Sequence, residues 1–294
     1  MARIAAFIRL GRPVFLAGGL VSFALGAAIA HAAGHAISWS RYALGQGAVT
    51  AFQLMTHYAN DFFDLEADRA NQTPTRWSGG SRVLPDGELP PHVAIAAALV
   101  FAAIGAVLAI VLGGIALVTL TVILLLAWSY SAPPFRLCAA GLGELDTAIV
   151  VSMFVPWLGF ALQAPDLRGA RLLGLTIVPL ALLQAAMLIA IEFPDAAGDA
   201  ATGKRTLVVR LGAPVAAKLY VAITALAFAW PLAAQAFGMP GPIALAMASP
   251  APLALWQIMQ IRDHGNPATF ERMTLFAVML MVLTATCALA AWMI

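Results

Sequence analysis

The chain has 294 residues, of which 62% are hydrophobic, and it carries 16 Lys and Arg residues against 14 Asp and Glu residues. Soluble globular proteins have roughly a quarter of their residues charged, so this composition excludes a soluble enzyme. The net charge is only +2 and no stretch resembles a nucleic-acid surface, so no nucleic-acid partner is expected.

Long uncharged stretches predict membrane-spanning helices. Five of them have about the length of one span, and these are residues 13–40, 42–60, 147–165, 172–191 and 273–294. The stretches 89–135 and 219–261 would each be roughly twice as long as the ~30 Å hydrocarbon core if they formed one helix. Each contains a helix breaker near its middle, at Gly113-Gly114 and at 238–242, and is therefore predicted to fold back once.

The fold predicted from these stretches is an all-α, polytopic membrane protein with nine transmembrane helices, in which residues 1–294 form a single domain within the lipid bilayer. In chain order the predicted spans are 13–32, 41–60, 92–112, 115–130, 145–163, 172–192, 215–235, 242–260 and 271–293.

The sidedness of the charges predicts the orientation. With nine spans, the Lys and Arg residues gather on the side of the N-terminus; the exceptions are Arg41, Arg168 and Arg171. The positive-inside rule then places the N-terminus inside and the C-terminus outside the cytoplasmic membrane of a cell. The acids also lie inside, except Asp166, and are concentrated in two inner-face loops, 61–91 and 193–214. Because acids do not set topology, their position indicates where the chemistry takes place.

The first acidic cluster follows the second predicted span. Asn60, Asp64 and Asp68 are spaced i, i+4, i+8, and Asp61 lies within the same stripe if the helix continues. Clustered carboxylates repel one another unless a cation lies among them, and hard oxygen donors are the ligands that Mg²⁺ prefers.

The second cluster follows the sixth predicted span and places Asp195 and Asp199 at i, i+4. Basic residues are mixed with both clusters, and they are Arg69, Arg76, Arg82, Arg136, Lys204 and Arg205. Acids that hold Mg²⁺ beside cations that pair with phosphate are the requirements of a Mg²⁺-diphosphate site, and two clusters suggest two ions that share one diphosphate. The alternative is a set of solvated loop ends, with surface ion pairs worth at most about 1 kcal/mol.

The two clusters resemble the motifs of a known family. Asn60-Asp61-x-x-Asp64-x-x-x-Asp68 matches the first aspartate motif of the UbiA superfamily of intramembrane prenyltransferases. Asp195-x-x-x-Asp199, continued by Gly203-Lys204-Arg205-Thr206-Leu207, is similar to the second. The resemblance covers essentially the whole chain. It implies nine helices around a central cavity, two Mg²⁺ ions as cofactors, a polyprenyl diphosphate donor and an active site on the inner face.

The resemblance also implies roles for individual residues. The implied metal ligands are Asn60, Asp61, Asp64, Asp68, Asp195 and Asp199. Asn60 and Lys204 are also implied as diphosphate ligands, Tyr130 and Ser131 match polar residues near the leaving group, and Asp64, Asp199 and Lys204 form the implied catalytic set. Charge and position add Arg82, Arg136 and Arg205 as candidate diphosphate ligands.

Within the superfamily, the run Ser78-Gly79-Gly80-Ser81-Arg82-Val83-Leu84 and the Gly-Lys-Arg-Thr-Leu segment at 203–207 are most similar to the menaquinone branch. This similarity implies prenyl transfer to an aromatic quinone precursor, 1,4-dihydroxy-2-naphthoate. The alternatives are another acceptor (4-hydroxybenzoate, homogentisate, a porphyrin or a glycerol-phosphate ether), a terpene cyclase of the same superfamily, or a secondary transporter, in which buried ionisable residues mark a translocation path.

Overall fold

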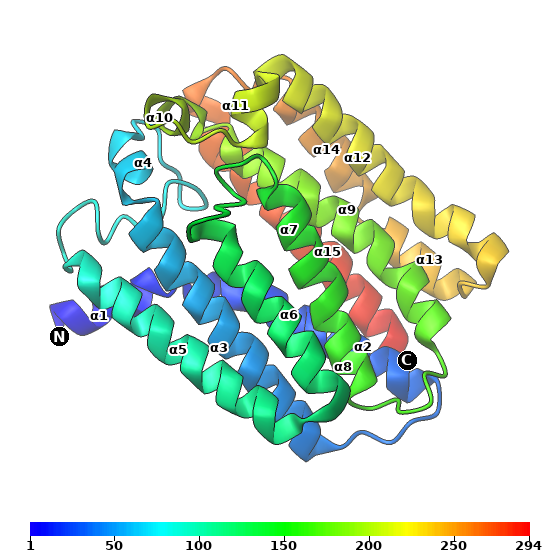
Figure 1. The fold of residues 1–294 in the computed structure, drawn as a ribbon. Helices are drawn as coiled ribbons and strands as arrows, with labels where there is room; N and C mark the ends of the chain where they lie inside the picture. The colour runs from blue at the N-terminus through cyan, green and yellow to red at the C-terminus, as the bar shows by residue number, and fades with distance from the viewer.

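Helices account for all the regular secondary structure of the computed structural model, which describes residues 1–294. In chain order they are α1 (Ala2–Leu10), α2 (Leu16–Ala32), α3 (Trp39–Phe63), α4 (Leu65–Ala70), α5 (Pro91–Leu112), α6 (Gly114–Ser131), α7 (Gly143–Ile149), α8 (Val155–Ala161), α9 (Ala170–Glu192), α10 (Ala196–Ala201), α11 (Leu207–Leu211), α12 (Ala213–Ala234), α13 (Gly241–Ala248), α14 (Ala251–Ile261) and α15 (Phe270–Met293). The long helices run side by side as a bundle (Figure 1), and the all-α prediction is confirmed.

Eight helical segments are long and apolar enough to cross a membrane, so the chain is a multi-pass membrane protein. The predicted span that is missing from these eight is the second, 41–60, which corresponds to α3; this helix has 25 residues and lies among the others, against α5 and α2. It does not meet the same hydropathy criterion. The reason is its composition, because α3 carries Arg41 near its start, Asp61 near its end and polar residues such as Gln53 and His57 between them.

Several spans differ from the predicted ones in their internal structure. The first is preceded by a separate short helix, α1. The fifth consists of α7 and α8, joined by a π-helical stretch at Val150–Phe154. Pro156 lies two residues after the end of this stretch, and its missing N–H group cannot bond to the carbonyl of Ser152 within it, which explains the irregular hydrogen bonding. The eighth is divided between α13 and α14 at Ser249-Pro250 for the same reason.

Two hydrophobic cores hold the bundle together. One is formed mainly by α9 and α12 to α15, and the other mainly by α3, α5, α6 and α8. Helix α2 joins them, since Leu25 belongs to the first core and Phe23 to the second.

Helices α2 and α8 approach each other closely through two glycines. A Cβ atom on Gly26 would lie 1.8 Å from the carbonyl oxygen of Pro156, and one on Gly159 would lie 2.1 Å from that of Phe23. Small residues at a contact let two membrane helices pack backbone to backbone.

The two polar loops meet at one end of the bundle. Loop 61–91 contains α4, loop 193–214 contains α10 and α11, and these three short helices lie together (Figure 1). Gly198 in α10 contacts Asn71 directly, since a Cβ atom there would lie 2.9 Å from the Asn71 nitrogen. The fold therefore brings the two acidic clusters, which are far apart in the sequence, to the same place.

Candidate active site

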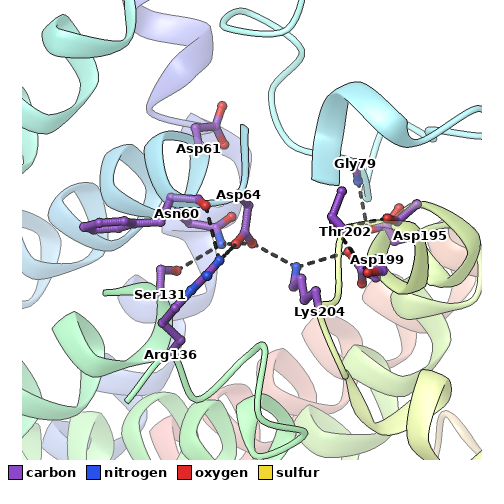
Figure 2. Close-up of polar contacts among 12 residues, drawn as sticks. Asn60, Asp61, Asp64, Gly79, Ser131, Arg136, Asp195, Asp199, Thr202 and Lys204 are labelled. Carbon is purple, nitrogen blue, oxygen red and sulfur yellow. Dashed lines mark hydrogen bonds and ion pairs between the residues drawn. The ribbon is translucent and has the colours of Figure 1, made fainter. Parts of the chain in front are cut away.

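The end of α3 supplies the first polar side chains of the site. Asn60 Nδ2 donates hydrogen bonds to Asp64 Oδ2 at 2.8 Å and to Ser131 Oγ, at the end of α6, at 3.1 Å. Helix α3 ends at Phe63 and α4 begins at Leu65, so Asp64 lies at the break between them. This break lets the Asp64 carboxylate point away from the helix axis toward the second acidic cluster (Figure 2).

Asp61 faces a different direction from Asp64. Its side chain is fully buried, pairs with the guanidinium of Arg12, and accepts hydrogen bonds from the Ser81 hydroxyl and from the Ser81 backbone N–H at 3.1 Å. Both carboxylate oxygens are thereby occupied, and Asp61 does not line the polar cavity described below. The ion pair fixes the segment before α2 against the end of α3.

Asp68 lies in α4, and loop 71–90 covers it. Gly80 lies so close that a Cβ atom on it would be 2.1 Å from Asp68 Oδ2. Gly80 also has a φ of +73°, a conformation that glycine adopts without strain. Arg82 Nη1 donates to the Asp68 carbonyl oxygen, and Arg82 Nη2 lies 3.4 Å from Asp86 Oδ1.

The second cluster is held by the same loop. Asp195 Oδ1 accepts a hydrogen bond from Asn71 Nδ2 at 2.7 Å, and Asp195 Oδ2 accepts one from the Gly79 backbone N–H at 3.0 Å. Asp199 lies one turn further along, and its Oδ1 is 3.4 Å from Lys204 Nζ. Loop 71–90 therefore contacts both acidic clusters.

Lys204 joins the two clusters. Its Nζ donates to Asp64 Oδ2 at 2.9 Å as well as approaching Asp199, so the ammonium group lies between the two carboxylates (Figure 2). The Lys204 side chain is only 14% exposed. Since the attraction between unlike charges grows as water is excluded, this contact stabilises the approach of loops 61–91 and 193–214.

The other candidate residues surround Lys204 and the two acidic clusters, and not all of them line the polar cavity described below. Tyr130 lines the polar cavity. Arg136 is half exposed, with its guanidinium 4.0 Å from Asp64 Oδ1. Arg205 is exposed, and neither it nor Arg82 lines the cavity. The diphosphate-binding role predicted for Arg82 and Arg205 stays a prediction.

Two cavities that share part of their walls lie at this centre and next to it, within the helix bundle. The polar one has a volume of about 80 Å³, and its wall includes Asn60, Asp64, Asp68, Asp195, Asp199 and Lys204. The apolar one has a volume of about 560 Å³ and extends between α2, α3, α6, α7, α9 and α15. Arg12, Asn60, Trp77 and Tyr130 line both. The site can therefore hold a ligand with a charged head and a long apolar tail, the tail lying within the bundle.

Burial shifts the protonation of the site. It raises the pKa of Asp68 to about 8, and Asp61, Asp64 and Asp195 add to this rise while Arg12 opposes it. Burial and the neighbouring Asp199 raise the pKa of Asp195 to about 6. Burial alone would lower the pKa of Lys204, but Asp64 and Asp199 raise it well above its usual value, so this residue stays charged. The site thus has an excess of acid that a further cation would relieve.

The donor set fits a divalent cation of the Mg²⁺ type. Asp64 Oδ1 and Asp68 Oδ2 are buried without a hydrogen-bond partner, and both residues line the polar cavity. No three His, Cys, Asp or Glu side chains converge on one point. Mg²⁺ commonly takes only one or two carboxylates and completes its shell with water and substrate phosphates, so a diphosphate would supply the remaining ligands.

Sequence reasoning missed two residues of the site, Arg12 and Asn71. The partners of Arg12 lie at positions 60 and 61 in the sequence, and the partner of Asn71 lies at position 195. Only the fold brings them together. The backbone conformation of Arg12 is also unusual, because its φ of 46° is strained for a residue other than glycine. Strained backbone conformations of this kind cluster at functional sites.

Comparison with known proteins gives a consistent result. The model of the UbiA prenyltransferase family matches residues 20–284. No curated protein sequence matches the chain.

Solved structures share the fold. The apo structure of a UbiA homologue from Aeropyrum pernix K1 aligns with a TM-score of 0.70 and 20% identity over 92% of this chain and 97% of that chain. A UbiA homologue from Archaeoglobus fulgidus bound to GPP and Mg²⁺ aligns with a TM-score of 0.67 and 15% identity over 96% and 99%. A digeranylgeranylglyceryl phosphate synthase studied in membranes aligns with a TM-score of 0.67 and 17% identity over 100% and 99%.

Proposed function

The chain belongs to the UbiA prenyltransferase family, and we propose that it transfers a prenyl group from a polyprenyl diphosphate to 1,4-dihydroxy-2-naphthoate in menaquinone biosynthesis, with Mg²⁺ as cofactor. One observation carries the reaction class: a small polar cavity, whose wall includes Asn60, five carboxylates and Lys204, adjoins an apolar cavity of about 560 Å³ and shares wall residues with it. This arrangement matches a diphosphate head and an isoprenoid tail better than the translocation path of a transporter, whose binding site is expected near the membrane midplane.

The proposed metal ligands are the motif aspartates that line the polar cavity, namely Asp64, Asp68, Asp195 and Asp199, together with the Asn60 side-chain oxygen; Glu192 also lines this cavity. A bound Mg²⁺ pair would neutralise the diphosphate and favour its departure from the allylic carbon. The structure of the A. fulgidus homologue with GPP and Mg²⁺ supports this assignment by analogy. Asp61 has both oxygens engaged, and we propose that it positions Arg12 and Ser81 rather than binding metal.

Lys204, Tyr130 and Ser131 are the proposed contacts to the leaving group. Lys204 supplies a buried positive charge that stabilises the charge developing on the diphosphate. Tyr130 lines both cavities, so its side chain lies where the scissile bond of the donor would lie. Arg136 lies at the edge of this group, with its guanidinium 4.0 Å from Asp64.

The apolar cavity would hold the prenyl chain and the acceptor ring. Its mostly hydrophobic wall excludes water, which would otherwise quench an allylic cation. Arg12 lines it at the polar end, and its Nε is buried without a hydrogen-bond partner. An aromatic acceptor with a carboxylate would satisfy this donor, and the ring would then lose the carboxylate as carbon dioxide when the new carbon–carbon bond forms.

The preference for the dihydroxynaphthoate rests on the resemblance of 78–84 to the menaquinone branch. In the fold these residues belong to the loop that contacts both acidic clusters, through Gly79 on Asp195 and Ser81 on Asp61. The run that resembles the menaquinone branch is therefore in direct contact with one proposed metal ligand, Asp195, and with the positioning residue Asp61. With the orientation predicted from the basic residues, we propose that this site lies at the inner face of the cytoplasmic membrane.

A second candidate is transfer to a glycerol-phosphate ether. It is favoured by the structural similarity to digeranylgeranylglyceryl phosphate synthase, which covers 100% of this chain. The two candidates differ in the acceptor, since one uses a ring carbon and the other an alcohol oxygen.

The test is an acceptor panel. Purified protein in lipid nanodiscs is incubated with Mg²⁺, a labelled prenyl diphosphate and, in separate reactions, 1,4-dihydroxy-2-naphthoate, 4-hydroxybenzoate, homogentisate and geranylgeranylglyceryl phosphate. We expect prenylated, decarboxylated product from the first acceptor and loss of all transfer in EDTA. Transfer to another acceptor alone would contradict the menaquinone assignment, and diphosphate release without any acceptor would indicate a cyclase.

A further inference from the structure

The apolar cavity contains one acidic side chain that no contact in the protein explains. Asp146 in α7 is the only acid in the wall of this cavity and is 5% exposed. Its Oδ1 is buried without a partner, and neither carboxylate oxygen takes part in any hydrogen bond or ion pair. An unpaired carboxyl group within a membrane bundle is destabilising, and such residues generally face a functional cavity.

Asp146 lies close to the junction of the two cavities. Gly143, three residues earlier on the same face of α7, packs on Tyr130, since a Cβ atom on Gly143 would be 3.2 Å from the Tyr130 ring. Asp146 is thus about one helical turn deeper in the bundle than this contact. Because Tyr130 and Asn60 line both cavities, a ligand at Asp146 lies next to the place where the allylic carbon of a bound donor would lie.

The chemistry around Asp146 selects one kind of ligand group. No basic side chain contacts it, and the side chain that follows it, Thr147, directs its hydroxyl to the backbone oxygens of Gly143 and Glu144, at 3.0 and 3.2 Å. A carboxylate in such surroundings accepts hydrogen bonds, so it favours a hydroxyl donor and disfavours an anionic group.

We propose that Asp146 binds a hydroxyl group of the prenyl acceptor through its unpartnered carboxylate in the apolar cavity. This assignment rests on the proposed function and adds to it the position of the acceptor. The carboxylate end of a ring lies at Arg12 and a hydroxyl end lies at Asp146. A hydroxyl that donates to a carboxylate also makes its ring more electron-rich, which favours attack on the allylic carbon. Both acceptor classes considered above carry a hydroxyl, on an aromatic ring or on a glycerol ether.

The test measures steady-state kinetics for Asp146→Ala and Asp146→Asn in nanodiscs, with separate titrations of donor and acceptor. Each aromatic acceptor is paired with its monomethyl ether, which lacks one hydroxyl proton but keeps the reacting ring carbon. Geranylgeranylglyceryl phosphate, whose alcohol oxygen is the nucleophile, is compared with its methyl ether as competitive inhibitors of transfer to the aromatic acceptor. We expect the wild-type protein to prefer the free hydroxyl by about tenfold or more and Asp146→Ala to lose this preference, with the acceptor KM raised to a similar extent. The donor KM is expected to change by less than about twofold, since Asp146 does not line the polar cavity. If the preference for the free hydroxyl disappears in Asp146→Ala for one acceptor and persists for another, the first acceptor is the one whose hydroxyl binds to Asp146.

Thr121→Val is the control, because Thr121 is a lipid-facing residue of α6 whose hydroxyl bonds only to its own helix, at Leu117. If Asp146→Ala does not fold, the isosteric Asp146→Asn carries the test. Full retention of the preference in the variants, or an equal rise of donor and acceptor KM, would overturn the assignment. Absence of transfer by the wild-type protein to every acceptor would overturn the proposed function, and this assignment with it.

Discussion

Lys204 Nζ lies 2.9 Å from Asp64 Oδ2, which joins two residues 140 positions apart in the chain. The same ammonium group is 3.4 Å from Asp199 Oδ1, so one cation links the two acidic clusters. Without it, Asp64 and Asp199 would face each other across a buried cavity with only the half-exposed Arg136, 4.0 Å from Asp64 Oδ1, to offset their repulsion. Lys204 therefore has two roles in this proposal: it holds the clusters together in the absence of metal, and it binds the diphosphate when substrate is present.

Lys204→Met removes the charge and keeps much of the length of the side chain. We expect prenyl transfer to fall about 100-fold or more, because a buried positive contact to the leaving group is lost. We also expect a lower melting temperature in EDTA, because the two carboxylates lose their shared partner. Saturating Mg²⁺ should narrow this difference in melting temperature, since the ions take over the neutralisation.

Lys218→Met is the matched control for Lys204→Met, because Lys218 is exposed on α12 and makes no ion pair. Its melting temperature and activity should stay at the wild-type values. A Lys204→Met protein with normal activity would show that this residue does not contact the leaving group.

Asp64→Asn tests the proposed metal set. The substitution keeps the shape of the side chain but removes one negative charge from the polar cavity. We expect Mg²⁺-dependent transfer to be abolished while the protein stays folded, as judged by gel filtration and thermal unfolding. The control is Asp166→Asn, which makes the same chemical change in an exposed loop, where Asp166 pairs with Arg168. Retained activity in Asp64→Asn would refute the metal assignment.

The positions of the membrane-spanning helices could be predicted from the lengths of the uncharged stretches. A span needs about 20 consecutive apolar residues, and such a run can be recognised without knowing what the helix packs against. The two acidic clusters were visible for a similar reason, since charge is scarce in this chain. The direction in which Asp61 points was not visible, because its partner Arg12 lies 49 residues away. Asp146 was not singled out either: the predicted span 145–163 contains it, but only the packing of α7 against the other helices shows that it faces the apolar cavity.

The raised pKa of Asp68 predicts how stability depends on pH when no metal is present. Its ordinary pKa of 3.8 applies to the unfolded chain and its folded value is about 8, so the folded state binds more protons between these values. Stability therefore falls as the pH rises through this window. In EDTA, the melting temperature should be lower at pH 8 than at pH 6, and Asp68→Asn should reduce this slope because it removes the titrating group. A melting temperature that rises between pH 6 and pH 8 would contradict the assigned burial of Asp68.

The contact between α2 and α8 predicts a steric sensitivity at Gly159. An added Cβ atom would lie 2.1 Å from the Phe23 carbonyl oxygen, which belongs to the backbone and yields only if the two helices separate. Such overpacking typically costs about 1–3 kcal/mol. We expect Gly159→Ala to lower the melting temperature and the yield of folded protein from detergent.

Gly174→Ala in α9 is the matched control, because a Cβ atom there meets nothing within 4 Å. Since α2 and the helix of α7 and α8 both line the apolar cavity, separating them should also weaken acceptor binding more than donor head-group binding. Equal melting temperatures for the two alanine variants would show that α2 and α8 do not pack as closely as the structure indicates.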